Sequence, residues 1–239
     1  MATENLAQRA YREIKEKIVY CEYYPGAMIN EQKICAELGY SRTPVREALN
    51  RLEQDRFVRI LPKKGVLVAD VSLGDIAQIY QVRMVVEPLV IHMAGPHLPE
   101  GELRRFRERF TNEQGDNVSS YRLDTAMHLF IIGHCGNEYL IEMMRRVFEK
   151  NTQVIIASGQ DRVAVHDARQ EHAQLLDYLL LKDYRKASDY MRIHLENCRK
   201  SAFEHIYNLT TATFPADTSY LTYMDRLYEE SAGKGFPEH

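Results

Sequence analysis

The sequence has few cysteines and no long apolar run. Its cysteines are far apart and form no Cys-x-x-Cys pair, so we expect neither a disulfide framework nor a thiolate zinc site. No segment approaches the roughly 20 apolar residues that a membrane-spanning helix needs, and the N-terminus lacks the pattern of a signal peptide. No internal repeat or low-complexity segment is visible. We therefore expect a cytoplasmic protein with no membrane partner. The cysteines are Cys21, Cys35, Cys135 and Cys198.

The composition is ordinary for a globular protein, but the charge is unevenly divided. The chain has 239 residues, of which 45% are hydrophobic and 27% charged, so it can bury a sizeable core and is long enough for two domains. Residues 1–70 hold 12 Lys and Arg against 10 Asp and Glu, whereas the remainder holds 19 against 24. A division of opposite sign indicates that the first part meets a polyanion and the second does not.

The first 70 residues show the pattern of a winged helix-turn-helix. Apolar spacing and capping residues predict helices over 6–20, 31–38 and 41–55, and Gly39 separates the second helix from the third. Two short strands, 57–60 and 66–69, follow around the turn LPKKG. Three helices and a hairpin are the parts of a winged helix-turn-helix domain.

From Ser72 onward the sequence predicts only helices, and hence an all-α bundle. The expected helices cover 73–94, 99–114, 118–134, 138–158, 162–181 and 183–205. The fold class is thus mainly α. We divide the chain into a winged helix-turn-helix domain (1–70), an all-helical domain (71–205) and a C-terminal extension (206–239). In that extension a short helix would place Tyr220, Met224, Leu227 and Tyr228 on one face, to dock on its own bundle or on a partner subunit.

The third predicted helix carries arginines on an outward face. With Ser41 as cap, Arg42 and Arg46 lie one turn apart near its N-terminus, where a recognition helix presents side chains to base edges. Arginine is the usual bidentate partner of guanine, and Thr43 could contact a phosphate or a thymine methyl. The inward face would hold the helix to its domain through Ala48, Leu49 and Leu52.

Two alternatives accompany this interpretation. Either arginine could simply pair with Glu47 or Glu53 on a solvated surface helix. The hairpin tip, Lys63, Lys64 and Gly65, could reach phosphate or the minor groove, but a KKG turn can also be no more than a soluble turn. The turn before the helix and the hairpin after it favour the DNA-binding interpretation.

The helical half contains a set of residues suited to a metal ion. Asp124 and His128 share one face of a helix, and His172 and His194 each share a helix with apolar residues that face the bundle. Three imidazoles and a carboxylate could converge in the bundle core, and such nitrogen and oxygen ligands suit zinc, nickel or manganese. The alternative is that these are ordinary hydrogen-bonded core or surface histidines.

Arg83 is a charged residue on an otherwise apolar helix. It could lie at the surface or form a salt bridge with Glu87.

The segment SRTPVREALNRLEQDRFV (41–58), with INEQKICAELGY before it and the KKG wing after it, resembles the DNA-binding domain of the GntR family of bacterial transcription regulators. The resemblance covers about residues 6–70. It implies that Arg42, Thr43 and Arg46 lie where the family contacts bases and phosphates, with Gly65 at the wing tip. Gln32 departs from the pattern, because some members have an arginine there that touches the operator.

Residues 72–205 resemble the FCD effector domain of the FadR-like GntR subfamily, through the pattern D-x3-H, then E-H, then M-x2-H. In metal-binding members the ligands match Asp124, His128, His172 and His194, which implies a divalent metal, with zinc the first expectation. The resemblance also gives Arg83 the role of reaching a carboxylate effector. A guanidinium beside a metal ion would clamp the carboxylate from two sides, and Tyr80, Arg145 and Asn151 could line the same pocket.

We therefore expect a homodimeric regulator that binds double-stranded operator DNA and responds to a small organic acid. A first rival is a metal-dependent hydrolase using the same Asp and His residues. It would need a general base, and Glu171, next to His172 in the sequence, is expected to point elsewhere. In a second rival the bundle serves only dimerisation.

Overall fold

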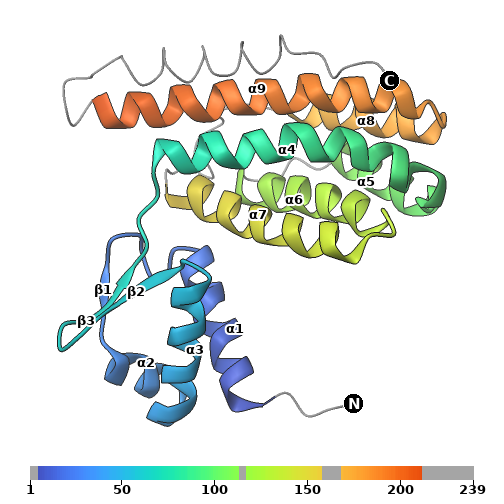
Figure 1. Ribbon diagram of the computed structural model, residues 1–239. Helices are drawn as coiled ribbons and strands as arrows, with labels where there is room; N and C mark the ends of the chain where they lie inside the picture. The colour runs from blue at the N-terminus through green and yellow to red at the C-terminus, as the bar shows by residue number, and fades with distance from the viewer. Residues whose placement is uncertain (1–4, 113–116, 158–167, 212–239) are drawn as a thin grey trace, which may run out of the picture.

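The computed structural model of the protein describes residues 5–112, 117–157 and 168–211. It is mainly helical, as predicted, with one small antiparallel sheet (Figure 1). In chain order the elements are α1 (Leu6–Val19), β1 (Met28–Ile29), α2 (Glu31–Leu38), α3 (Arg42–Gln54), β2 (Val58–Leu61), β3 (Gly65–Val68), α4 (Leu73–Ala94), the 3-10 helix η1 (Gly95–His97), α5 (Glu100–Asn112), α6 (Asn117–Gly133), α7 (Glu138–Ala157), α8 (Arg169–Leu180) and α9 (Tyr184–Thr211).

The first three helices form around their own apolar core. Asn30 caps α2 by accepting a hydrogen bond from the backbone N–H of Gln32, and Gly39 ends it in the left-handed conformation that glycine adopts without strain. α3 packs across α1 through fully buried apolar residues on each helix. The core of this part draws on Ala10, Ile14, Ile18, Val19, Tyr23, Ile29, Ile34, Val45, Ala48, Leu49, Leu52, Phe57, Val58, Val66 and Val68.

The wing is a hairpin of β2 and β3, to which β1 adds a third strand in the order β1-β3-β2. The sequence did not predict β1, because two residues are too few for a strand pattern to be seen. Gly65 has φ 121°, and a Cβ there would lie 2.9 Å from the carbonyl oxygen of Ile29. Close pairing of β1 with β3 therefore gives this position a structural reason to be glycine.

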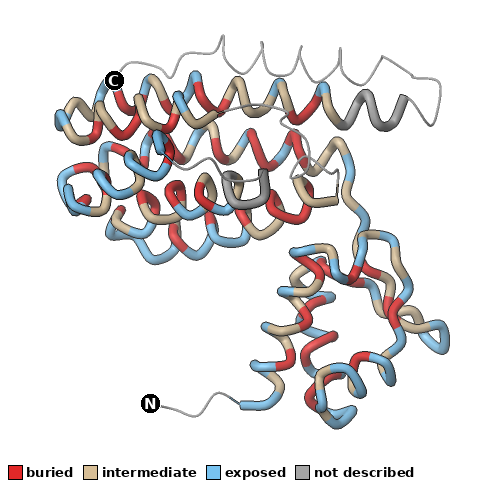
Figure 2. The backbone as a smooth tube through the Cα atoms, turned by 180° about the vertical axis from the view of Figure 1, so that it is seen from behind, coloured by how far each residue is buried: buried red, intermediate tan, exposed pale blue. Residues whose placement is uncertain are grey.

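The second part is the predicted helical bundle, to which the described residues contribute the six α-helices α4 to α9. Its first helix, α4, begins at a capping box in which the hydroxyl of Ser72 accepts from the backbone N–H of Asp75. α4 packs along α9, and α5 packs along α8 (Figure 1). Figure 2 shows the buried residues along the inward faces of the helices, so the bundle has a core separate from that of the winged part.

Most predicted helix ends agree with the structure, and two regions differ. The expected helix 162–181 is seen as α8 from Arg169, while its first residues fall in 158–167, outside the described residues. α9 continues to Thr211 rather than ending at 205, because no glycine or proline interrupts it. The proposed short helix with Tyr220 lies in 212–239, also outside the described residues.

The two parts meet where α7 lies beside α1. Across this boundary Lys15 Nζ is 2.5 Å from Glu149 Oε1, and the Tyr24 hydroxyl donates a 2.8 Å hydrogen bond to the carbonyl of Ala157. None of the described helices is long and apolar enough to cross a membrane.

Candidate functional site

The N-terminal half of α3 presents an exposed polar face. Arg42, Thr43 and Arg46 are exposed, while the opposite face is buried in the core of the winged part. The side chain of Arg46 is 63% exposed, and its Nε lies 2.9 and 3.0 Å from the two carboxylate oxygens of Glu31, at the start of α2. The ion pair expected within the helix is therefore made to the neighbouring helix instead, and it holds the guanidinium at the surface.

Ser41 stands at the N-cap of α3, but its side chain makes no capping hydrogen bond. The expectation that its hydroxyl caps the helix is wrong, although its backbone has the extended conformation of a cap residue. The hydroxyl is exposed beside Arg42 and can be used for another contact.

The other positive groups fall into two sets. Lys63 and Lys64 are exposed in the turn between β2 and β3, directly before Gly65, the first residue of β3. Arg51 instead stacks on the ring of Tyr11, with its Cζ 4.3 Å from the ring centre, and so faces α1. The arginines of α3 therefore do not all share one surface.

In the bundle, Asp124 and His128 of α6 meet His172 of α8 and His194 of α9. One ligand atom from each of the four lies within 4.8 Å of all the others. His172 Nε2 is 2.8 Å from Asp124 Oδ1 and 3.2 Å from His194 Nε2, while His128 Nε2 is 3.4 Å from Asp124 Oδ1. All three imidazoles are almost fully buried. The helices thus bring together the residues singled out in the sequence.

The donor set fits a metal ion. His128 Nε2 is buried and makes no hydrogen bond within the described residues, which is costly for a polar atom unless something else binds it. Three imidazole nitrogens and one carboxylate oxygen are ligands that zinc, nickel and manganese accept.

The electrostatics of the cluster favour a cation. Burial alone would raise the pKa of Asp124, but His128 and His172 outweigh this effect and hold it well below its usual value. Burial lowers the pKa of His194 to about 3, with His172 adding to the effect. Burial would likewise lower the pKa of His128, yet the carboxylates of Glu87 and Asp124 raise it to about 9. Asp124 and His194 are thus already in the protonation states that metal binding requires, whereas His128 must release its proton when a metal ion binds.

Two further carboxylates hold the outer sides of the imidazoles. Glu87 Oε2 forms a short hydrogen bond with His128 Nδ1, and Glu171 Oε2 lies 2.8 Å from His194 Nδ1. As expected, Glu171 does not face the centre of the cluster; it reaches from α8 to α9 and contacts the outer side of His194. Glu171 contacts the nitrogen that faces away from the cluster, so it is not placed as a base for a cluster-bound water.

Arg83 forms the predicted salt bridge with Glu87, at 2.6 Å between Nε and Oε1, and both side chains are 2% exposed. Its guanidinium also lies over the ring of Phe148, 4.5 Å from the ring centre. Its Nη2 has no hydrogen-bond partner among the described residues. The arginine is therefore anchored through Nε while one donor edge remains open.

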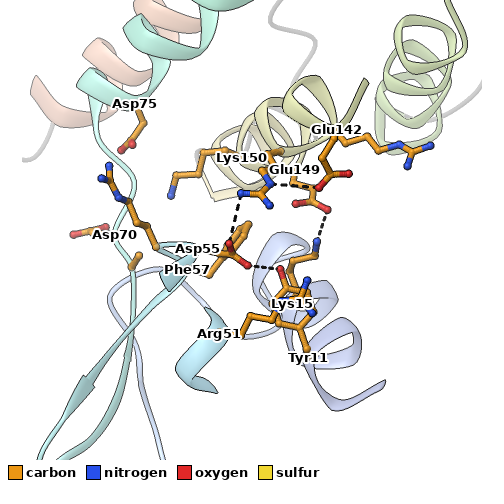
Figure 3. Close-up of a pocket in the computed structure, with 14 residues that line it drawn as sticks. Tyr11, Lys15, Arg51, Asp55, Phe57, Asp70, Asp75, Glu142, Glu149 and Lys150 are labelled. Carbon is orange, nitrogen blue, oxygen red and sulfur yellow. Dashed lines mark hydrogen bonds and ion pairs between the residues drawn. The ribbon is translucent and has the colours of Figure 1, made fainter. Parts of the chain in front are cut away.

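The other residues expected near Arg83 separate. Tyr80 and Asn151 are buried in the bundle, and the Arg83 guanidinium lies 5.3 Å from the centre of the Tyr80 ring. Arg145 is exposed and lines a different cavity, of about 610 Å³, between α7 and the winged part (Figure 3). Arg146 of α7 and Asp55 of the winged part both line this cavity, and Arg146 Nη1 lies 3.7 Å from Asp55 Oδ1. The grouping of Arg145 with the cluster is therefore wrong, since its side chain leaves α7 on the opposite side.

Sequence reasoning missed the roles of Glu87 and Glu171 as partners of the histidines. Glu87 could have been noticed as a second charge on the apolar helix α4, one turn after Arg83. Glu171 gave no such signal, because its contact to α9 depends on how two helices pack.

Comparison with known proteins assigns the chain to a family. The profile of the bacterial regulatory proteins of the gntR family matches residues 6–68, and that of the FCD domain matches residues 78–197. The Nta operon transcriptional regulator of Aminobacter aminovorans is 25% identical over 197 residues, which span 80% of this chain and 92% of that protein.

Two other matches agree. An uncharacterized HTH-type transcriptional regulator of Agrobacterium vitis is 45% identical over 78 residues, 33% of this chain and 46% of that protein. The crystal structure of a putative transcriptional regulator GntR from Rhodococcus sp. RHA1 has the same fold, with a TM-score of 0.71 at 23% identity over 83% of this chain and 97% of that one. The two family models and the regulator of Aminobacter aminovorans describe transcription regulators and not enzymes, so the comparisons favour a regulator over the hydrolase alternative. The chain belongs to the GntR family of transcription regulators, with an FCD domain following its helix-turn-helix domain.

Proposed function

We propose that this transcription regulator binds its operator as a homodimer and releases or tightens it in response to a small carboxylate bound beside a metal ion in the FCD domain. It would act in the cytoplasm. The division into 1–70, 71–205 and 206–239 is the corresponding proposal for its domains. The observation that carries the proposed function is the buried cluster of one Asp and three His residues, together with Arg83, whose Nη2 has no hydrogen-bond partner among the described residues.

The DNA contacts would come from α3 and the wing. Arg42 and Arg46 would read base edges in the major groove, with Ser41 and Thr43 on the flanking phosphates. Their exposure on one face of α3 supports this assignment. The wing would add the contacts of Lys63, Lys64 and Gly65 to the backbone or the minor groove.

The metal ion would be held by Asp124, His128, His172 and His194, with zinc the first expectation and nickel or manganese as alternatives. Bound there, it would supply positive charge and open coordination positions for an anionic oxygen. The ionised state of Asp124, whose pKa lies well below its usual value, supports this proposal, because a metal ion requires a deprotonated carboxylate ligand.

The effector would be a small organic acid. Arg83 is fixed by Glu87 and by Phe148, so its remaining N–H groups are already oriented and little side-chain entropy is lost on binding. A carboxylate between this edge and the metal ion would be held from two sides.

α7 offers the connection to DNA. It carries Phe148 beneath Arg83, and on its outer side Arg146 and Glu149 face the winged part. A small shift of α7 on effector binding would move the recognition helices of a dimer relative to each other, and half-site spacing would convert that shift into a change of operator affinity.

The test is a titration of operator affinity with a panel of small organic acids, using metal-loaded protein. We expect at least one acid to change the affinity, and by linkage the operator should change the affinity for that acid equally. Arg83→Lys keeps the buried charge but loses the planar fork, so it should lose the response while retaining metal. A monomeric protein whose operator affinity is the same at saturating concentrations of every acid would refute the proposal.

A further inference from the structure

Two histidines of the cluster are held in the same way by carboxylates from outside it. Glu87, on α4, uses one oxygen for His128 Nδ1 and the other for Arg83 Nε. Glu171, on α8, uses one oxygen for His194 Nδ1 and the other for Asn197 Nδ2, at 2.8 and 2.6 Å. Each carboxylate is therefore itself fixed by a donor on its far side.

This arrangement determines which ring nitrogen faces the cluster. An imidazole that donates Nδ1–H to a carboxylate presents the lone pair of Nε2 on the other side of the ring. The Nε2 atom of His194 lies 3.2 Å from that of His172, and the Nε2 atom of His128 lies 3.4 Å from Asp124 Oδ1. Both outer carboxylates thus turn a ligand nitrogen toward the same point.

His172 is held differently. Its Nδ1 is buried and has no hydrogen-bond partner among the described residues, and its ring packs on Phe110 with the ring centres 4.5 Å apart. The contrast shows that burial in this bundle does not by itself place a carboxylate at the Nδ1 atom of every buried histidine. The two that are present are specific features of the site.

Resting on the proposed metal site, we propose that Glu87 and Glu171 are positioning residues of the metal centre, which orient His128 and His194 and make their Nε2 atoms stronger ligands. Carboxylates behind ligand histidines typically change metal affinity by about 10- to 100-fold. Glu87 has a second role, because its other carboxylate oxygen accepts a hydrogen bond from Arg83 Nε and so holds that arginine in place. One buried carboxylate would then set both the metal ligand and the arginine that receives the effector.

The experiment measures Zn²⁺ affinity of the metal-free full-length protein by competition with a chelator. We expect Glu87→Gln and Glu171→Gln each to weaken Zn²⁺ binding about 10- to 100-fold. Substitution with Co²⁺ should give a visible absorption spectrum that differs from that of the parent in both variants, which a loss of general stability would not cause. Glu102→Gln, which removes an exposed partner of Arg105, is the matched control and should bind like the parent.

Glu87→Gln leaves Arg83 buried without its partner and could fail to fold, so Glu171→Gln and the double variant Arg83→Gln/Glu87→Gln keep the test decisive. Folded variants that all keep the Zn²⁺ affinity and Co²⁺ spectrum of the parent would overturn the inference while leaving the proposed function intact. A parent protein that binds no Zn²⁺, Ni²⁺ or Mn²⁺ would overturn the proposed metal site as well.

Discussion

Replacing Arg46 with alanine should weaken operator binding without changing the fold. Its side chain is 63% exposed and its only described ion pair is with Glu31, so the effect on stability should stay within about 0.5 kcal/mol. A bidentate arginine to guanine contact discriminates by about 1–3 kcal/mol. To contact a guanine, Arg46 must first break its exposed ion pair with Glu31, which costs about 0.2–1 kcal/mol and reduces the gain by that amount. We therefore expect a net loss of about 1–2 kcal/mol, or roughly 5- to 30-fold in Kd.

The assay is fluorescence anisotropy at one fixed salt concentration, with an operator selected from random duplexes by the parent protein. Arg46→Ala should lose affinity for this operator much more than for an unrelated duplex, because base contacts carry sequence information and phosphate contacts do not. Arg104→Ala, which removes an arginine of similar exposure from the bundle, is the control. Glu31→Gln should tighten binding, since it frees Arg46 and removes a negative charge. Equal operator affinities of Arg46→Ala and the parent would refute the assignment.

Three other predictions concern the winged part. Lys64→Ala should weaken binding to all duplexes alike and reduce the slope of log K against log salt by about 1. Gly65→Ala should lower the melting temperature more than Gly26→Ala, because both have positive φ but only at Gly65 would the new Cβ meet a carbonyl, at 2.9 Å. Lys17 holds the pKa of Glu37 below its usual 4.5, so the carboxylate stabilises the fold above that pH and this stability is lost as the pH falls through the lowered pKa. The melting temperature of Glu37→Gln should accordingly be lower than that of the parent at pH 7, and the two should converge in acid. A difference in melting temperature that does not change with pH would contradict this.

The sequence predicted the helices well because their signals are local. Asn30 and Gly39 mark helix ends through capping and turn chemistry, and the structure has ends at both places. β1 could not be predicted, since its two residues become a strand only by pairing with β3. The continuation of α9 to Thr211 shows the opposite case, in which a Thr-rich stretch stayed helical because nothing in it ends a helix.

The cluster was predictable in its members but not in its surroundings. Asp124 and His128 share a helix face by spacing alone, and the family pattern adds His172 and His194. The partners Glu87 and Glu171 depend on how α4 meets α6 and how α8 meets α9, which spacing along one helix does not contain. Arg145 was misplaced for the same reason.

The most direct test of the account is elemental analysis of the purified protein, combined with native mass spectrometry. We expect one divalent metal ion per chain in a homodimer. The variant His194→Ala should hold no metal, because it lacks the Nε2 atom that faces the cluster in the parent. His134 lies in the same bundle but forms a hydrogen bond with the carbonyl of Phe130 instead, so the control variant His134→Ala should keep its metal. A parent protein that holds no metal after reconstitution with zinc, nickel and manganese, or a His194→Ala variant that holds as much as the parent, would contradict the account.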